Sequence, residues 1–241
     1  MATDTHAAWT CPVTHRETRK DARRAGEPAR QAAWIAWFGD VSREDVAQVG
    51  GTAATLGELT RAGVPVPRGF VVTADAYLCA LDQVGGQGEL RFRVAGVDVD
   101  DPAALARAAK KCQALVRSAG MPEAMRCAVL DAYARLGRGV PVAVRVSATA
   151  DDTAPTSFAG INEFTNVRGS LELVDRIVEC WASRWSPRVV AYRVTHALAG
   201  EPAMAVVVQP MVDARMSGVT PTADPVRILR SVTAGKVPSR Q

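Results

Sequence analysis

The segment AMAVVVQPMV, at residues 203–212, constrains the fold of this chain more than any other stretch of its sequence. It is apolar along almost its whole length and contains three consecutive valines, a pattern typical of a strand that is buried on both faces. The segment SGVTPTADP, at residues 217–225, is suited to pair with it. We therefore predict a sheet in which residues 203–212 form a central strand.

Three other stretches rich in β-branched or aromatic residues are predicted to add strands to this sheet. They are AAWIAWFGDV at 32–41, GFVVT at 69–73 and PVAVRVS at 141–147. Helical patterns lie between the strands, and the predicted helices cover residues 52–62, 74–84, 102–119, 122–136, 171–185 and 187–199. Because strands and helices do not alternate regularly, the predicted fold class is α+β.

Residues at the ends of these elements support the predicted limits. Ser42 opens an S-x-x-D sequence, and Thr73 and Asp101 also precede helical patterns, so all three are predicted N-caps. Gly63 suits a C-cap, because glycine adopts the left-handed conformation that often ends a helix. Residues 85–102 contain several glycines and are predicted to form a loop with one short strand.

The composition narrows the class of protein. With 241 residues, of which 48% are hydrophobic, the chain can bury a sizeable core. No apolar run reaches the length of about 18 residues that a membrane-spanning helix needs. The arginine-rich N-terminus lacks the apolar core of a secretory signal. We therefore expect a cytoplasmic protein without a membrane partner.

The cysteines and histidines do not form the pattern of a metal centre or a disulfide framework. No two cysteines form a CxxC pair, and the three histidines are dispersed. We predict reduced cysteines that pack inside the fold, and no metal ligands from this chain. The cysteines are Cys11, Cys79, Cys112, Cys127 and Cys180, of which the last four lie in helical patterns.

Residues 1–31 are predicted to form a disordered basic tail. Six of the first 30 residues are lysine or arginine, which contributes to the net charge of +4. Nucleic-acid binding is the alternative interpretation of this tail. Three acidic residues interrupt the basic cluster and no aromatic side chains interleave with it, so nucleic acid is not expected as a partner.

The stretch VGGTAATLGEL, at residues 49–59, places Gly50 and Gly51 directly before a helical pattern. Backbone N–H groups at a helix N-terminus bind anions, and glycine lets the backbone come close to them. The stretch matches neither GxxxxGK[ST] nor GxGxxG, the common phosphate-binding sequences. Thr52 stands where a cation would help to hold a phosphate. Taken alone, the stretch fits a turn before a helix better than a nucleotide-binding loop.

A second stretch, VAVRVSATADDTAPTSFAG at residues 142–160, has the composition of a loop that folds over phosphates. Arg145 lies near the end of a hydrophobic strand, where its forked guanidinium can bind two phosphate oxygens together. Several hydroxyl side chains follow it, and the loop closes on Gly160. The residues leave an alternative open, in which Arg145 pairs with Asp151 or Asp152 in a surface turn.

A third stretch, VVVQPMV at residues 206–212, carries polar and thioether groups on a buried strand. Gln209 and Met211 could lie beside a flat aromatic base. Taken alone, a core strand is the simpler interpretation.

In this order, the three stretches resemble the ATP-binding N-terminal region of the phosphoenolpyruvate synthase and pyruvate phosphate dikinase family, which the rifamycin phosphotransferases share. VGGTAATLGELTRAGVPVPRGFVVTADAY is similar to VGGKGAxLGEL…AGxPVPxGFVVTAxAY, and VAVRVSATADDTAPTSFAG is similar to VAVRSSATAEDLPxASFAG. VECWASRWSPRVVAYRVTHAL resembles a helical CWASLWxxRAxxYR, and MAVVVQPMVDARMSGVTPTADP resembles MAVVVQxMVxAxxSGVxFTxxP. The resemblance covers residues 34–225.

The resemblance implies the N-terminal part of an ATP-grasp type nucleotide-binding domain with a helical insertion. The incomplete domain would occupy residues 32–225, between the basic tail and a divergent C-terminal tail at residues 226–241. It would bind ATP with Mg²⁺ and phosphorylate a histidine on a separate domain, here supplied by another protein. That phosphohistidine would pass the phosphoryl group to pyruvate or to another acceptor, such as an antibiotic or a glucan.

Site residues carry over position by position from the resemblance. Arg145, as the catalytic residue, would contact the ATP phosphates, and Gly160 would lie in the loop that covers them. The adenine would be bordered by Gln209, Met211 and Val212. The phosphate loop would comprise Gly50, Gly51 and Thr52.

The chain departs from the family pattern at several of these positions. The family's phosphate-binding lysine corresponds to Thr52, a serine after the arginine corresponds to Val146, and a phenylalanine near the end corresponds to Pro221. After Gly160 the sequence is one residue shorter, so the family's ATP-contacting threonine has Thr165 as its nearest counterpart. The acidic Mg²⁺ ligands of the family have no counterpart in residues 226–241.

These departures lead to two hypotheses. In the first, the chain is the ATP-binding segment of a phosphotransferase. In the second, it is a catalytically silent, truncated or non-enzymatic remnant, or a fragment similar to a rifamycin phosphotransferase. Losing a cationic phosphate contact and the metal ligands weakens charge stabilisation, on which phosphoryl transfer depends.

Overall fold

The computed structural model describes residues 34–149, 163–195 and 203–218 of the chain. Two compact units are present, Met1–Met211 and Val212–Gln241. In the second unit the structure describes residues 212–218, which contain no helix or strand. The elements of the first unit are the strands β1 (Ile35–Trp37), β2 (Phe70–Val72), β3 (Val142–Ala148), β4 (Glu163–Val167) and β5 (Met204–Pro210), the 3-10 helices η1 (Phe38–Asp40) and η2 (Arg43–Asp45), and the helices α1 (Val46–Arg61), α2 (Ala74–Asp82), α3 (Gly86–Val94), α4 (Pro102–Ala119), α5 (Glu123–Leu136), α6 (Ser170–Ser183) and α7 (Pro187–Thr195).

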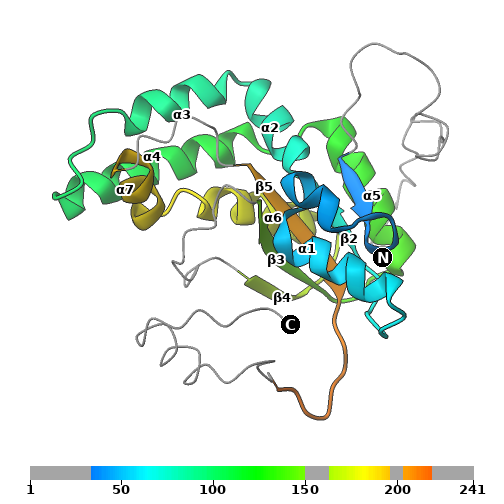
Figure 1. Cartoon of the computed structure of the whole chain (residues 1–241). Coiled ribbons are helices and arrows are strands. Elements are labelled where there is room, and N and C mark those ends of the chain that lie inside the picture. The colour runs from blue at the N-terminus through cyan, green and yellow to red at the C-terminus, as the bar shows by residue number, and fades with distance from the viewer. Residues whose placement is uncertain (1–33, 150–162, 196–202, 219–241) are drawn as a thin grey trace, which may run out of the picture. The chain divides into compact units, whose positions relative to one another are not determined.

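The five strands form one sheet in the order β1-β2-β5-β3-β4, and every neighbouring pair is antiparallel. Figure 1 shows β5 in orange between its neighbours, which confirms the predicted central strand. Strands β2 and β3 occupy both edges of β5 over Val206–Val208. Of the segment predicted to pair with β5, residues 219–225 lie outside the described residues. A mixture of helices with an antiparallel sheet agrees with the α+β class.

The two faces of the sheet carry separate hydrophobic clusters, because successive side chains of a strand point to opposite faces. Val71, Ala205 and Val207 lie on the face that α1 covers. The opposite face carries Val144 and Val206, and α2 and α6 pack against strands there. The larger hydrophobic cluster lies on this face and also includes side chains of α3, α4, α5 and α7. Helix α1 is therefore the element that can place groups near the first of these faces.

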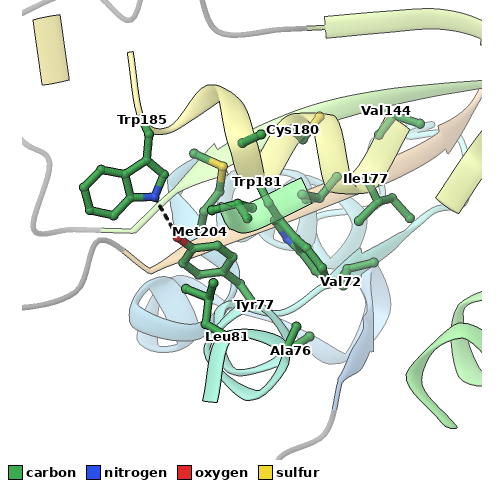
Figure 2. Close-up of a cluster of buried hydrophobic side chains, with 14 of the residues drawn as sticks. Val72, Ala76, Tyr77, Leu81, Val144, Ile177, Cys180, Trp181, Trp185 and Met204 are labelled. Atoms are coloured by element: carbon green, nitrogen blue, oxygen red, sulfur yellow. Dashed lines mark hydrogen bonds between the residues drawn. The ribbon is translucent and has the colours of Figure 1, made fainter. Parts of the chain in front are cut away.

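Aromatic side chains form the centre of the larger cluster (Figure 2). The indole N–H of Trp185 donates a hydrogen bond to the hydroxyl of Tyr77 at 3.0 Å. The rings of Tyr77 and Trp181 lie 5.8 Å apart at 57°, which is a tilted aromatic pair. The hydrogen bond gives the buried indole N–H of Trp185 an acceptor.

The three predicted N-caps, Ser42, Thr73 and Asp101, are confirmed. Ser42 and Asp45 form a capping box, and the Thr73 hydroxyl accepts a hydrogen bond from the N–H of Ala76. The Asp101 carboxylate accepts one from the N–H of Ala103 at 2.8 Å. Hydrogen bonds from the backbone N–H groups of Ala104 and Ala103 lower the pKa of Asp101, as expected for an ionised N-cap.

Gly63 ends α1 as predicted. Its φ is 77°, and its N–H donates to the carbonyl of Thr60, while the N–H of Val64 donates to the carbonyl of Leu59. These are the two hydrogen bonds of a Schellman motif.

One segment has a different secondary structure from the one predicted, and one strand was not predicted. Residues 86–94 form helix α3 instead of a loop with a strand. The reason is tertiary, because Leu90 is fully buried in the larger cluster and Arg93 donates to the carbonyl of Lys111 on α4. Strand β4 was not predicted, since its sequence, EFTNV, gains its strand conformation by pairing with β3.

The cysteines of the described residues form no disulfide, and all four lie in helices, as predicted. Burial raises the pKa of the Cys180 thiol to about 12, and the nearby Glu179 adds to this shift. The thiol therefore stays protonated at neutral pH and acts as an apolar packing group. None of the described helices is long and apolar enough to span a membrane.

Candidate functional site

Helix α1 is interrupted at Gly50, at the start of the predicted phosphate loop. Gly50 has φ 77° and ψ 167°, so two helical segments meet there. The second segment begins directly after Gly50, which confirms the predicted helix start near Thr52. Gly51 and Thr52 are exposed in its first turn, where backbone N–H groups have no intrahelical acceptor.

Ser147 of β3 holds this first turn of α1. The N–H of Ala53 donates a hydrogen bond of 3.1 Å to the Ser147 hydroxyl, and Ser147 is fully buried. Gly50 also packs against Ser147, because a Cβ added at Gly50 would lie 2.3 Å from the carbonyl oxygen of Ser147. The glycine turn and β3 are therefore joined by a direct contact between residues far apart in the sequence.

Arg145 lies two residues before Ser147 on β3, on the same face of the sheet. Its Nε is 2.7 Å from Oε1 of Glu163, the residue directly opposite on β4. This Nε is buried and the contact lacks hydrogen-bond geometry, so the pair is electrostatic. Both side chains remain about half exposed, at 43% for Arg145 and 51% for Glu163. The alternative partners, Asp151 and Asp152, lie outside the described residues.

Gln209 lies on β5, on the same face as Arg145. It pairs with Ala143 of β3, and Arg145 is two residues further along that strand. Gln209 is buried, and its side-chain N–H donates a hydrogen bond of 2.9 Å to the carbonyl of Pro67. The side chain therefore fixes the loop before β2.

The structure gives less information about the remaining predicted site residues. Met211 is half-buried, and its N–H donates to the carbonyl of Pro141. Val212 begins the second compact unit and is 61% exposed there. Gly160 lies outside the described residues. Thr165 is exposed on β4, next to Asn166, whose φ of 57° marks an irregular register between β4 and β3.

The structure thus brings the glycine turn, Arg145 and Gln209 to one face of the sheet. Two residues at this site were not predicted from the sequence. Ser147 was predicted only as one of several hydroxyl side chains that follow Arg145, without a role of its own, and Glu163 lies on a strand that the sequence did not predict. The only local signal was the position of Ser147 two residues after Arg145, where side chains of a strand share a face.

At this face of the sheet Arg145 is a cation that could bind phosphate, whereas the described residues offer no group of metal ligands. Arg145 is the charged group that the family resemblance assigns to phosphate, and Glu163 offsets its charge. Within residues 34–149, 163–195 and 203–218, no group of three or more His, Cys, Asp or Glu side chains could hold a metal ion.

A helix N-terminus and a strand arginine on one face of an antiparallel sheet define a domain suited to bind phosphate-bearing ligands. The family model for the pyruvate phosphate dikinase AMP/ATP-binding domain matches residues 46–236. This match covers most of the chain, so the chain belongs to that family.

Curated relatives support the same assignment. The chain is 40% identical over 200 residues to a probable phosphoenolpyruvate synthase of Methanocaldococcus jannaschii, covering 80% of this chain and 17% of that protein. It is 40% identical over 200 residues to the phosphoenolpyruvate synthase of Aeropyrum pernix, covering 80% and 24%. A rifampicin phosphotransferase of Streptomyces sp is 41% identical over 193 residues, covering 78% and 22%. The chain spans less than a third of the length of each of these relatives.

Proposed function

We propose that this chain is the N-terminal part of an ATP-grasp type domain in a phosphoenolpyruvate synthase-like phosphotransferase. It binds ATP and takes part in phosphorylating a histidine on a separate domain. The single observation that carries this proposal is the shared sheet face of the glycine turn and Arg145, joined through Ser147. The names of the relatives, synthases and a phosphotransferase, support the reaction class.

The proposed roles follow the chemistry of each group. Exposed backbone N–H groups of Gly51 and Thr52, after the turn at Gly50, receive phosphate oxygens. The Arg145 guanidinium binds the phosphates as a fork. Gly160 belongs to the loop that covers them. Gln209, Met211 and Val212 border the adenine, with Gln209 acting through its backbone while its side chain holds Pro67.

We propose that the domain occupies residues 32–225, between tails at residues 1–31 and 226–241. The family match supports the main part of this domain and continues to residue 236. Mg²⁺ would enter with the nucleotide and shield its phosphates, and among the described residues no group of three or more His, Cys, Asp or Glu side chains could hold it alone. No step of the proposal is therefore routed through the metal.

Thr52→Lys is expected to tighten ATP binding by about tenfold to a hundredfold, because a charge-assisted contact contributes roughly 1.5–3 kcal/mol. Thr52 is exposed in the first turn after Gly50, so a lysine there can reach a bound phosphate without disturbing the core. Isothermal titration calorimetry with ATP and Mg²⁺ measures the dissociation constant of both chains. Thr55→Lys, which adds the same charge one turn further along α1 at an exposed position, is the matched control.

Three outcomes decide between the proposed function and a catalytically silent chain. Equal gains from Thr52→Lys and Thr55→Lys would show a general charge effect and contradict the phosphate-loop assignment. An absence of ATP binding in the wild-type chain and in Thr52→Lys would contradict any ATP-dependent role. Phosphohistidine formation on a relative's histidine domain, detected with an antibody against phosphohistidine, would exclude the silent chain.

Glu163→Gln is expected to tighten ATP binding by about twofold to fivefold, because an exposed ion pair contributes up to about 1 kcal/mol. Glu163 lies 2.7 Å from Arg145 and competes with phosphate for the same guanidinium. The matched control is Glu89→Gln, which breaks an exposed ion pair with Arg93 on α3. Weaker ATP binding by Glu163→Gln in calorimetry would instead mean that Glu163 orients Arg145 for the ligand.

A further inference from the structure

The first turn of α1 after Gly50 has a buried hydrogen-bond partner outside its own helix. Ala53 is among the first residues of that segment, where the backbone N–H has no intrahelical acceptor. The Ser147 hydroxyl accepts this N–H at 3.1 Å, and both residues are fully buried. Ser147 thus acts as an N-cap for α1 although it belongs to strand β3.

Gly50 fixes the same turn from a second direction. A Cβ at this position would lie 2.3 Å from the carbonyl oxygen and 2.4 Å from the hydroxyl oxygen of Ser147. The backbone of Gly50 therefore rests directly on Ser147, while the hydrogen bond to Ala53 follows three residues later. With both contacts in place, the turn cannot slide along β3 without breaking one of them.

Ser147 also lies on the strand that carries Arg145. The two residues are separated by one position and share a face, so they are about 7 Å apart along β3. The position of α1 relative to Ser147 therefore sets the position of the Gly51 and Thr52 N–H groups relative to the Arg145 guanidinium. These are the two kinds of group that would hold the phosphates of one nucleotide.

We propose that Ser147 is a positioning residue for nucleotide binding, which holds the N–H groups of the α1 turn in register with Arg145. The inference rests on the proposed function, because it concerns the same phosphate site. Without the hydroxyl, the Ala53 N–H is buried without an acceptor, and the turn moves or frays to reach water. The phosphate-binding N–H groups then lose their fixed position.

The test compares Ser147→Ala with Tyr77→Phe. Tyr77→Phe also removes a buried hydrogen bond, to Trp185, but in the cluster on the opposite face of the sheet. Two quantities are measured for each folded chain: the ATP dissociation constant by calorimetry, and the hydrogen-exchange rate of the Ala53 amide by NMR. Ser147→Cys, which replaces the hydroxyl with a slightly larger thiol that is a weaker acceptor, is measured as a second variant.

Ser147→Ala is expected to weaken ATP binding about threefold to tenfold, the range of a lost N-cap, and to speed exchange at Ala53. Tyr77→Phe is expected to lower the melting temperature and leave both quantities unchanged. Ser147→Cys is expected to lie between the wild-type chain and Ser147→Ala, and it serves as the test if Ser147→Ala does not fold.

The inference and the proposed function fail in different ways. Unchanged ATP binding and unchanged Ala53 exchange in the Ser147 variants would overturn the inference while ATP binding by the wild-type chain upholds the function. Equal weakening by Ser147→Ala and Tyr77→Phe would also overturn it, because the effect would then follow stability alone. If the wild-type chain binds no ATP, the proposed function fails and the positioning role fails with it.

Discussion

Gly50→Ala is expected to lower the free energy of unfolding by about 3 kcal/mol or more. Two costs act together at this residue. Its φ of 77° with ψ of 167° lies in a region that is open almost only to glycine, and a side chain there costs about 1–3 kcal/mol. The added methyl group also meets the Ser147 carbonyl oxygen at 2.3 Å, and overpacking of this kind costs a further 1–3 kcal/mol or so.

Gly51→Ala is the matched control, because it makes the same chemical change at the next residue. Gly51 is exposed, a Cβ there meets nothing within 4 Å, and its φ is not positive. This variant is expected to leave stability unchanged or to raise it by up to about 1 kcal/mol. Urea denaturation followed by circular dichroism measures both chains. Equal stabilities would mean that the turn at Gly50 is not packed on Ser147.

The fold was predictable where the information is local. Asp101 and Pro102 specify the start of α4, and the predicted and observed limits of that helix, residues 102–119, are the same. The valine-rich segment likewise predicted β5 as a central strand. Helix α3 was missed because its glycines disfavour a helix, whereas burial of Leu90 favours it. The burial of Leu90 depends on contacts with residues that are distant in the sequence.

The site was predictable only as separate stretches. Motifs in the sequence indicated the glycine turn, Arg145 and Gln209. They did not indicate that all three lie on the same face of the sheet. That information lies in the strand register, in which Ala143 pairs with Gln209. The contact between Gly50 and Ser147 and the pairing of Arg145 with Glu163 are tertiary, so no local pattern could predict them.

The charged groups at this face of the sheet determine how tightly ATP is expected to bind. A phosphate site gains affinity from cations that are not already neutralised. Here Thr52 replaces the lysine of the family pattern, and Glu163 lies against Arg145. Thr52→Lys and Glu163→Gln change these two features separately. Because the two residues lie on different elements and act on different groups, their effects on ATP affinity are expected to add.

Leu173→Ala is expected to lower the free energy of unfolding by about 3 kcal/mol, within the range of roughly 2–5 kcal/mol for a buried leucine. Leu173 is fully buried in the larger hydrophobic cluster. Its helix, α6, contacts α4 as well as β3 and β5, so a cavity there weakens the packing of the sheet against its helical layer. Loss of this layer would affect the strand that carries Arg145 and Ser147.

The control for this prediction is Leu171→Ala, on the same helix two residues earlier. Leu171 is 77% exposed, so the same change is expected to alter stability by no more than about 0.5 kcal/mol. Urea denaturation of both variants gives the two free energies, and an unchanged dependence on urea concentration shows that the unfolded states are comparable. A similar loss in both variants would contradict the observed orientation of α6, in which Leu173 faces the core and Leu171 points to the opposite side of the helix. The difference between two identical substitutions therefore tests directly how α6 covers the sheet.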